Sequence, residues 1–223
     1  MTTYWTFDPA IRAIVAFPSE IGIVSKERAV RAYRLSSYYF SKTVSEIQLL
    51  VLLPTFFYTS CYWMAGLSGV KEFFTTLPIL LLNVVSAQGL GLLLGALISN
   101  IKASLNTCNT LILISLLFSG FITQTFPTWM HWAKYFSMIH YTISAISIIT
   151  LNDMEHVSCK LTAVANFPKC IRNSSEFVTS EDVLLDAGID LPVYWYICMM
   201  LVVLIISRVA TYYALRVKYT QLK

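Results

Sequence analysis

The sequence predicts an all-α fold, a polytopic bundle of helices that crosses a membrane several times. Four long apolar runs carry this prediction, and they cover residues 43–64, 73–98, 106–126 and 193–207. A helix needs about 20 mostly apolar residues to cross the hydrocarbon core of a bilayer, so the runs are interpreted as transmembrane helices. The composition agrees, because 57% of the residues are hydrophobic and only 13% are charged, whereas soluble domains average roughly 25% charged residues.

The positions of the basic residues predict how these helices are oriented. Lys and Arg crowd into the segments before the first run and after the last one, and Lys102 lies between the second and third runs. Short loops rich in Lys and Arg remain in the cytoplasm. Four crossings then place both termini of this chain in the cytoplasm and residues 127–192 outside. The net charge of +4 is therefore an orientation signal, and we expect membrane lipids, not nucleic acid, as partners.

The runs divide the chain into five parts. Residues 1–18 are typical of the end of a membrane helix whose beginning is missing, although Asp8 and Arg12 are unusual charges for such a helix. Residues 19–42 are polar, and residues 43–126 contain three crossings. Residues 127–192 form an extracellular or re-entrant loop, and residues 193–223 form the last crossing with a cytoplasmic tail.

The polar part, residues 19–42, has two interpretations. Its charges are spaced as in a helix, with Glu27 four residues before Arg31, and its tyrosines are typical of a membrane interface. One interpretation is a juxtamembrane anchor that lies along the membrane. The other is a coupling element, a helix on which a cytoplasmic motor pushes.

Small residues in the second run predict close helix packing. Ala87, Gly91 and Gly95 stand four residues apart, which places them on one face of a helix. Because that face has no large side chains, a second helix can approach it closely. The stripe indicates packing and carries no information about a cargo.

The loop of residues 127–192 carries signals of an extracellular location. Cys159 and Cys170 lie in a polar stretch, and Asn173 opens an Asn-x-Ser sequon just beyond them. A disulfide between cysteines of this loop and a glycan on Asn173 both suit the secretory pathway. The two signals agree with the side of the membrane that the basic residues predict.

Motifs for catalysis are absent from the sequence. The chain has no Gly-x-x-x-x-Gly-Lys-Ser/Thr motif, so we expect no nucleotide site and no cofactor in this chain. It also lacks His-Glu-x-x-His and Gly-x-Ser-x-Gly motifs. His131 and His140 are nine residues apart, off a shared helical face, which favours interfacial hydrogen bonding over metal binding.

Three segments are characteristic when they are taken together. They are AFPSEIGIVSKERAVRAYRLSSYYFSK at residues 16–42, AQGLGLLLGAL at residues 87–97, and FSG at residues 118–120 ahead of an aromatic-rich stretch. Together they closely resemble the membrane domain of the G subfamily of ABC transporters, the white-type half-transporters. In that family a nucleotide-binding domain precedes six spans, so this chain resembles a truncated ABC type-2 exporter membrane domain, from the end of the second span through the sixth.

The resemblance implies how the chain is coupled to ATP. Glu27, Arg28, Tyr33 and Arg34 match the family's first cytoplasmic loop, which packs on the nucleotide-binding domain and transmits its motion. ATP and magnesium are implied only for that missing domain, which belongs either to the same protein or to a partner. Two half-transporters pair in this family, so a homodimer or a heterodimer is expected.

The resemblance also implies a cavity and a gate. Leu113 and Leu116 match positions that line the central cavity, and Phe121 with Ile122 matches a bulky apolar pair that closes the top of that cavity. From the residues alone, plain helix packing remains the alternative for all four. The outer-loop cysteines and sequon resemble the family's disulfide and glycan region.

Three functions remain open at this point. The first is the permease part of an ATP-driven half-transporter that exports a lipid, a sterol or another hydrophobic small molecule at the plasma membrane. The second is a truncated, non-transporting membrane protein that pairs with full-length half-transporters and modulates them. The third and least favoured is an intramembrane enzyme built on His131 or His140.

Overall fold

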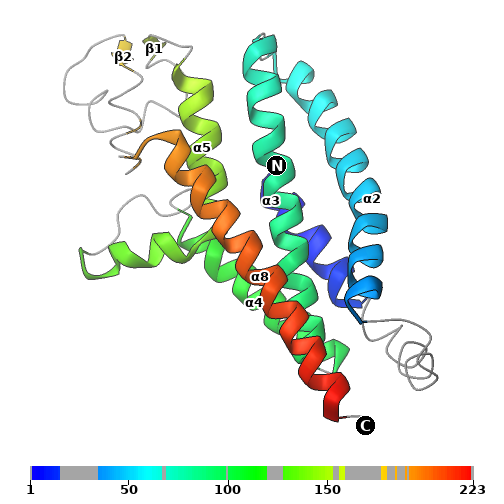
Figure 1. Ribbon diagram of the computed structural model, residues 1–223. Coiled ribbons are helices and arrows are strands. Elements are labelled where there is room, and N and C mark those ends of the chain that lie inside the picture. Colours follow the sequence, from blue (N-terminus) through cyan, green and yellow to red (C-terminus); the bar gives the residue numbers. More distant parts are fainter. Residues whose placement is uncertain are drawn as a thin grey trace.

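The structure is a computed structural model, and it forms a helical bundle with one short strand pair at its end (Figure 1). It describes residues 2–15, 35–66, 69–98, 100–119, 128–152, 156–158, 177–179, 184, 189 and 191–221. A first helix covers residues 4–15. The elements after it are α2 (Leu35–Met64), α3 (Val70–Leu97), α4 (Ile101–Leu117), η1 (Thr128–Phe136), α5 (Met138–Asn152), β1 (His156–Ser158), β2 (Phe177–Thr179) and α8 (Val193–Gln221).

Three helices are long and apolar enough to cross a membrane, namely α2, α3 and α8. They correspond to the first, second and fourth apolar runs, which confirms a multi-pass membrane protein. The last run ends at Ser207, but α8 continues to Gln221. Its final turns carry basic and aromatic residues that apolarity alone does not detect.

The third crossing differs from the prediction of one helix over residues 106–126. Instead, α4 begins at Ile101 and ends after 17 residues at Leu117, so it is about 25 Å long and shorter than the hydrocarbon core of about 30 Å. After η1, the 15-residue helix α5 continues toward the opposite end of the bundle. Two shorter helices therefore cover the height that one span was expected to cover.

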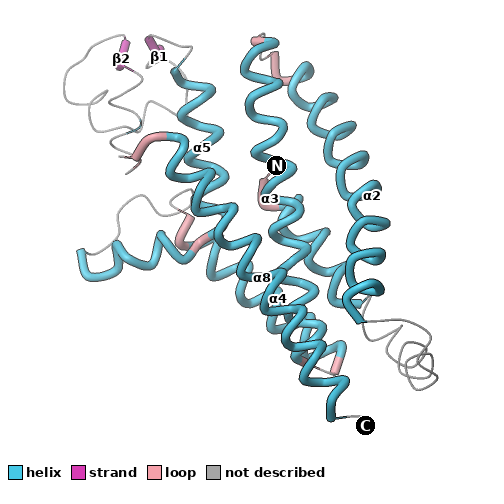
Figure 2. Tube along the Cα trace, in the orientation of Figure 1, coloured by secondary structure: helices cyan, strands magenta, loops and turns pink. Residues whose placement is uncertain are grey.

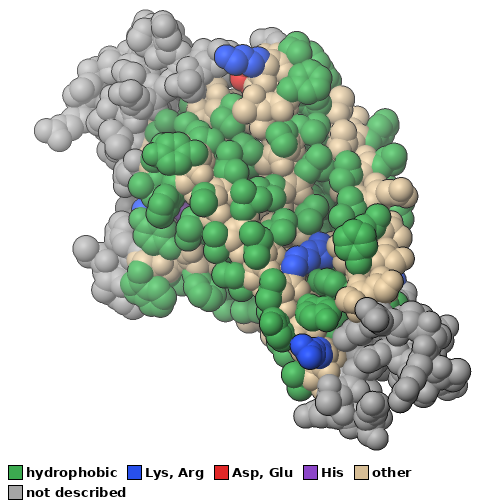
Figure 3. All heavy atoms as spheres, viewed as in Figure 1, with side chains coloured by type: hydrophobic (Ala, Val, Ile, Leu, Met, Phe, Trp, Pro, Cys, Tyr) green, Lys and Arg blue, Asp and Glu red, His purple; other side chains and the backbone are tan. Residues whose placement is uncertain are grey.

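Helix α3 forms the centre of the bundle. It packs against α2, α4, α5 and α8, and 56% of the residues in its most apolar window are buried, against 11% in α2 and 17% in α8. The outer faces of α2 and α8 are accordingly rich in exposed apolar side chains, such as Phe56 and Ile206. Figure 3 shows hydrophobic side chains spread across the described part of the visible face, as expected for a surface in contact with lipid.

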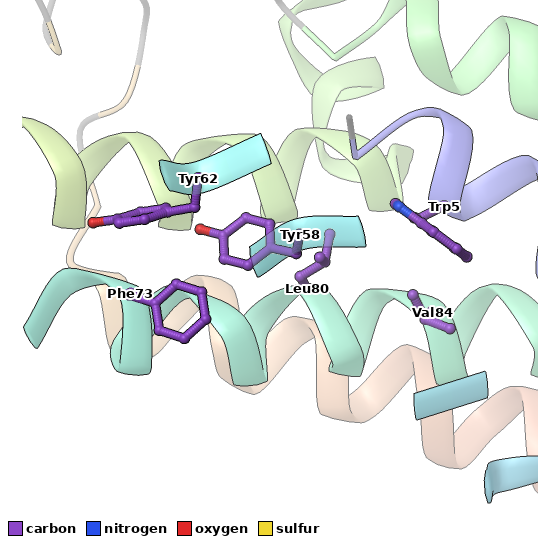
Figure 4. Close-up of a cluster of buried hydrophobic side chains, with 6 residues drawn as sticks. All are labelled: Trp5, Tyr58, Tyr62, Phe73, Leu80 and Val84. Atoms are coloured by element: carbon purple, nitrogen blue, oxygen red, sulfur yellow. The ribbon is translucent and has the colours of Figure 1, made fainter. Parts of the chain in front are cut away.

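An aromatic cluster joins α2 to α3 at one end of the bundle (Figure 4). The ring centroids of Tyr58 and Phe73 are 5.7 Å apart and the rings are stacked. The Tyr58 hydroxyl lies 2.6 Å from Thr76 Oγ1, and the Tyr62 hydroxyl donates to Gly69 O at 2.7 Å. The buried tyrosines thus satisfy their polar atoms while their rings hold the two helices together.

The two ends of the bundle have different contents. The start of α2 and the C-terminal end of α8 lie at one end, and the strands β1 and β2 lie at the other (Figures 1 and 2). The strands pair antiparallel, with Ser158 opposite Phe177. This pair is the single departure from all-α structure within the described part of the chain.

Candidate functional site

Helix α4 attaches to the bundle along one narrow edge. Its buried residues are Ser104, Cys108 and Ile112, which are spaced four apart and form a single line on the helix. The predicted cavity residue Leu113 is 53% exposed. Leu116 is half-buried and packs against the cluster that contains Ile112 and Ile139. The structure therefore puts Leu113 on the open face of α4 and Leu116 at its border with the core.

Other predicted site residues lie outside the described residues. They are the coupling residues Glu27, Arg28, Tyr33 and Arg34, the gate residues Phe121 and Ile122, the cysteines Cys159 and Cys170, and the sequon residue Asn173. In the sequence, residues 159–176 come after β1 and before β2.

The small-residue stripe lies where the helix of residues 4–15 meets α3. A Cβ placed on Gly91 would lie 2.3 Å from Ala10 O, and one placed on Gly95 would lie 3.0 Å from Ile14 O. Ala87 is buried on the same helix. A neighbouring glycine outside the predicted stripe, Gly89, permits the approach of α8, because a Cβ there would lie 2.5 Å from Ser207 Oγ.

A buried polar triad, which the sequence analysis missed, joins three elements. Asn83 in the middle of α3 has no exposed surface. Its Nδ2 donates to Thr6 Oγ1 at 3.0 Å, and its Oδ1 accepts from Thr142 Oγ1 of α5 at 3.1 Å. Polar side chains inside a membrane bundle join helices in this way. The signal in the sequence was an asparagine inside an apolar run.

A second polar group joins α2, α3 and α8. Gln88 Nε2 donates to Glu46 Oε2 at 2.6 Å, and Gln88 Oε1 accepts from Arg208 Nη2. Lys42 Nζ lies 3.3 Å from Glu46 Oε1, one helical turn away. A glutamine thus stands between a carboxylate and a guanidinium, and its two ends match the charges on either side.

A third connection joins α4 to α5. Ser137 Oγ donates to Ser115 O at 2.6 Å and accepts from His140 N at 3.2 Å, so it caps the start of α5. The buried His140 ring has Nδ1 3.0 Å from Ser119 O. Because a carbonyl can only accept, Nδ1 carries the proton. His140 thus donates a hydrogen bond to Ser119 O, just beyond the end of α4. The side chain of His131 lies outside the described residues.

Comparisons with known proteins agree with this architecture. Residues 1–151 match the family model described as ABC-2 type transporter. The chain therefore belongs to the ABC-2 type transporter family, as a multi-pass membrane domain. The match includes Asp8 and Arg12, whose side chains form an ion pair at 2.8 Å on the first helix, so these charges do not exclude residues 1–18 from the domain.

Relatives named as G family members agree with the resemblance to the G subfamily. The chain is 42% identical to ABC transporter G family member 21 of Arabidopsis thaliana over 139 residues, covering 62% of this chain and 21% of that protein. It is 30% identical to Protein white of Drosophila melanogaster over 222 residues, covering 97% of this chain and 31% of that protein. The chain thus spans between a fifth and a third of the length of these relatives.

Proposed function

We propose that this chain is the permease part of an ATP-driven half-transporter that exports a lipid, a sterol or another hydrophobic small molecule. The observation that carries the proposal is the bare face of α4, which buries only a line of three residues in the bundle. A membrane helix attached so narrowly has room for a second subunit or a cavity on its other side.

The chemistry of this face supports a cavity or a subunit contact over lipid. Asn106 and Asn109 are exposed on it, one and two turns into α4, ahead of Leu113 and Leu117. Side-chain amides are costly in hydrocarbon and are tolerated where they face water or another protein surface. The exposed face of α2 carries Phe56 and, nearer the start of that helix, one amide, Gln48.

A second half-transporter, identical or different, would cover the α4 face and complete the cavity. The nucleotide-binding domain, in the same protein or in the partner, would bind ATP and magnesium. We assign the coupling to Glu27, Arg28, Tyr33 and Arg34, and the gate to Phe121 and Ile122, as the family resemblance implies. In this proposal the protein lies in the plasma membrane and both termini of the chain are in the cytoplasm. A Cys159–Cys170 disulfide and a glycan on Asn173 are then on the outer side.

Crosslinking tests the proposed contact. Leu113→Cys places a thiol on the open face of α4, and Phe56→Cys places one on the outer face of α2, where the side chain is 76% exposed. In native membranes we expect a short bifunctional thiol reagent to give dimers with Leu113→Cys well above the unsubstituted chain. Phe56→Cys is expected to stay at the background level. Equal dimer yields from the two variants would refute the α4 contact.

An alternative is a non-transporting protein that pairs with full-length half-transporters and modulates them. It rests on the same family match, which covers residues 1–151. Co-purification with a full-length relative, with loss of that relative's transport on overexpression of this chain, would favour the alternative. Transport that requires this chain together with a nucleotide-binding domain would favour the exporter.

A further inference from the structure

An almost wholly apolar cavity of about 150 Å³ lies between the helix of residues 4–15, α3, α4 and the start of α5. It lies behind the edge by which α4 attaches, with Ala87 of α3, Cys108 of α4 and Met138 of α5 among its walls. None of the roles assigned above uses this space.

The lining gives water little to bind. Thr6 and Ser115 supply the hydroxyl groups of the wall, and the Thr6 hydroxyl already donates to Thr2 O at 2.9 Å and accepts from Asn83. A buried water typically needs two to four polar partners, and apolar cavities of this size remain dry. The cavity is therefore suited to a hydrocarbon group.

Hydrogen bonds at two sides keep the cavity from collapsing. The bonds from Asn83 to Thr6 and from Thr142 to Asn83 hold the first helix, α3 and α5 together. The bond from Ser137 to Ser115 O holds α5 to α4. Closing the space would break these hydrogen bonds and leave buried donors and acceptors unpaired. The free-energy penalty for an unpaired buried group is larger than the net free energy that one hydrogen bond contributes to stability.

We propose that this cavity binds the end of an alkyl chain or a single ring. A cavity of about 150 Å³ accommodates a molecule the size of benzene, so a four-ring sterol nucleus does not fit. Leu111, another wall residue, is 46% exposed, so the cavity is reached beside the bare face of α4. The chain end belongs either to a bilayer lipid or to a transported amphiphile; only the second source rests on the proposed function.

Photo-crosslinking tests the site in the whole chain reconstituted in nanodiscs. One sample contains a phosphatidylcholine with a diazirine at the end of an acyl chain, and the other a free fatty acid with the same group. We expect mass spectrometry to find adducts on peptides that contain Cys108 and Met138. Labelling by the phospholipid alone identifies bilayer lipid as the source, and labelling by the fatty acid alone identifies a free amphiphile.

A filled cavity provides the matched comparison. Ser115→Leu places a larger side chain in the cavity and keeps Ser115 O, the acceptor for Ser137. The larger side chain takes the space of about two methylene groups of the bound alkyl chain, which weakens binding of that chain by about tenfold. Labelling of the Cys108 peptide should therefore fall by about the same factor. Thr110→Leu makes a similar change on the exposed face of α4 and should keep the labelling. Ala87→Val is a second filling variant if Ser115→Leu elutes as an aggregate.

Two results would overturn the proposal. One is the absence of adducts on the Cys108 and Met138 peptides of the unsubstituted protein with both probes. The other is equal labelling of these peptides in a well-folded filling variant and in Thr110→Leu. Neither result depends on whether Leu113→Cys crosslinks, so a failure here is distinct from a failure of the transporter proposal.

Discussion

Gln88 in α3 donates a hydrogen bond to Glu46 in α2 across 2.6 Å, and it is held from the other side by Arg208 of α8. The amide therefore has a defined orientation, with its NH₂ group toward the carboxylate and its oxygen toward the guanidinium. Through these two hydrogen bonds, one uncharged side chain connects the three helices α2, α3 and α8.

Replacing Gln88 by Leu should destabilise the bundle. The change removes the partner that Glu46 and Arg208 share, while Lys42 still pairs with Glu46 and Val85 O still accepts from Arg208. A hydrogen bond to a charged group contributes about 1.5–3 kcal/mol, so we expect a loss of about that size. Reversible unfolding in mixed detergent micelles measures the loss. Gln48→Leu, at an exposed position of α2, is the matched control and should change stability little. Similar losses in both variants would show that the bridge contributes nothing specific.

Alanine substitutions in the glycine stripe should have graded effects. Gly91→Ala puts a Cβ 2.3 Å from Ala10 O, whereas Gly95→Ala puts one 3.0 Å from Ile14 O. Overpacking against backbone costs about 1–3 kcal/mol, so Gly91→Ala should lose more stability than Gly95→Ala. Limited proteolysis measures the displacement, because residues 4–15 become more sensitive to protease when the first helix moves away from α3. The opposite order would mean that this helix does not lie on α3 as described.

Asn83 and Thr142 should be energetically coupled. A double-mutant cycle with Asn83→Leu and Thr142→Val isolates their interaction, which in membrane bundles averages about 0.6 kcal/mol and reaches about 1.7 kcal/mol. Thr107 provides the comparison, because its hydroxyl bonds only within α4, to Ala103 O at 2.9 Å. The cycle of Asn83→Leu with Thr107→Val should give no coupling, and a zero value for the first cycle would contradict the triad.

His140→Asn should preserve what His140→Leu removes. The Asn side-chain nitrogen can occupy the place of Nδ1 and donate to Ser119 O, which lies 3.0 Å from the histidine nitrogen. We expect His140→Leu to lose about 0.5–1.5 kcal/mol of stability and His140→Asn to recover most of it. Thermal unfolding in detergent compares the two. A loss of equal size in both would indicate that ring packing matters and the hydrogen bond does not.

Apolar runs predicted α2, α3 and α8 because a long helix in lipid has to be apolar throughout. The same signal failed at residues 106–126, since apolarity does not reveal where one helix ends and another begins. Gly91 and Gly95 indicated close packing, but their partner was unknown without the fold. Asn83 and Gln88 were visible as polar residues in an apolar run, yet their roles depend on Thr6, Thr142, Glu46 and Arg208, which come from distant parts of the chain.

A crossing made of two pieces also has an electrical consequence. Helix α4 ends where α5 begins, so the partial negative charge of one helix end faces the partial positive charge of the other. Ser137 and His140 bridge the two ends through Ser115 O and Ser119 O. The bundle thus contains a polarised junction built from backbone dipoles, away from its charged termini, with Lys134 of η1 as a charged side chain that acts on His140.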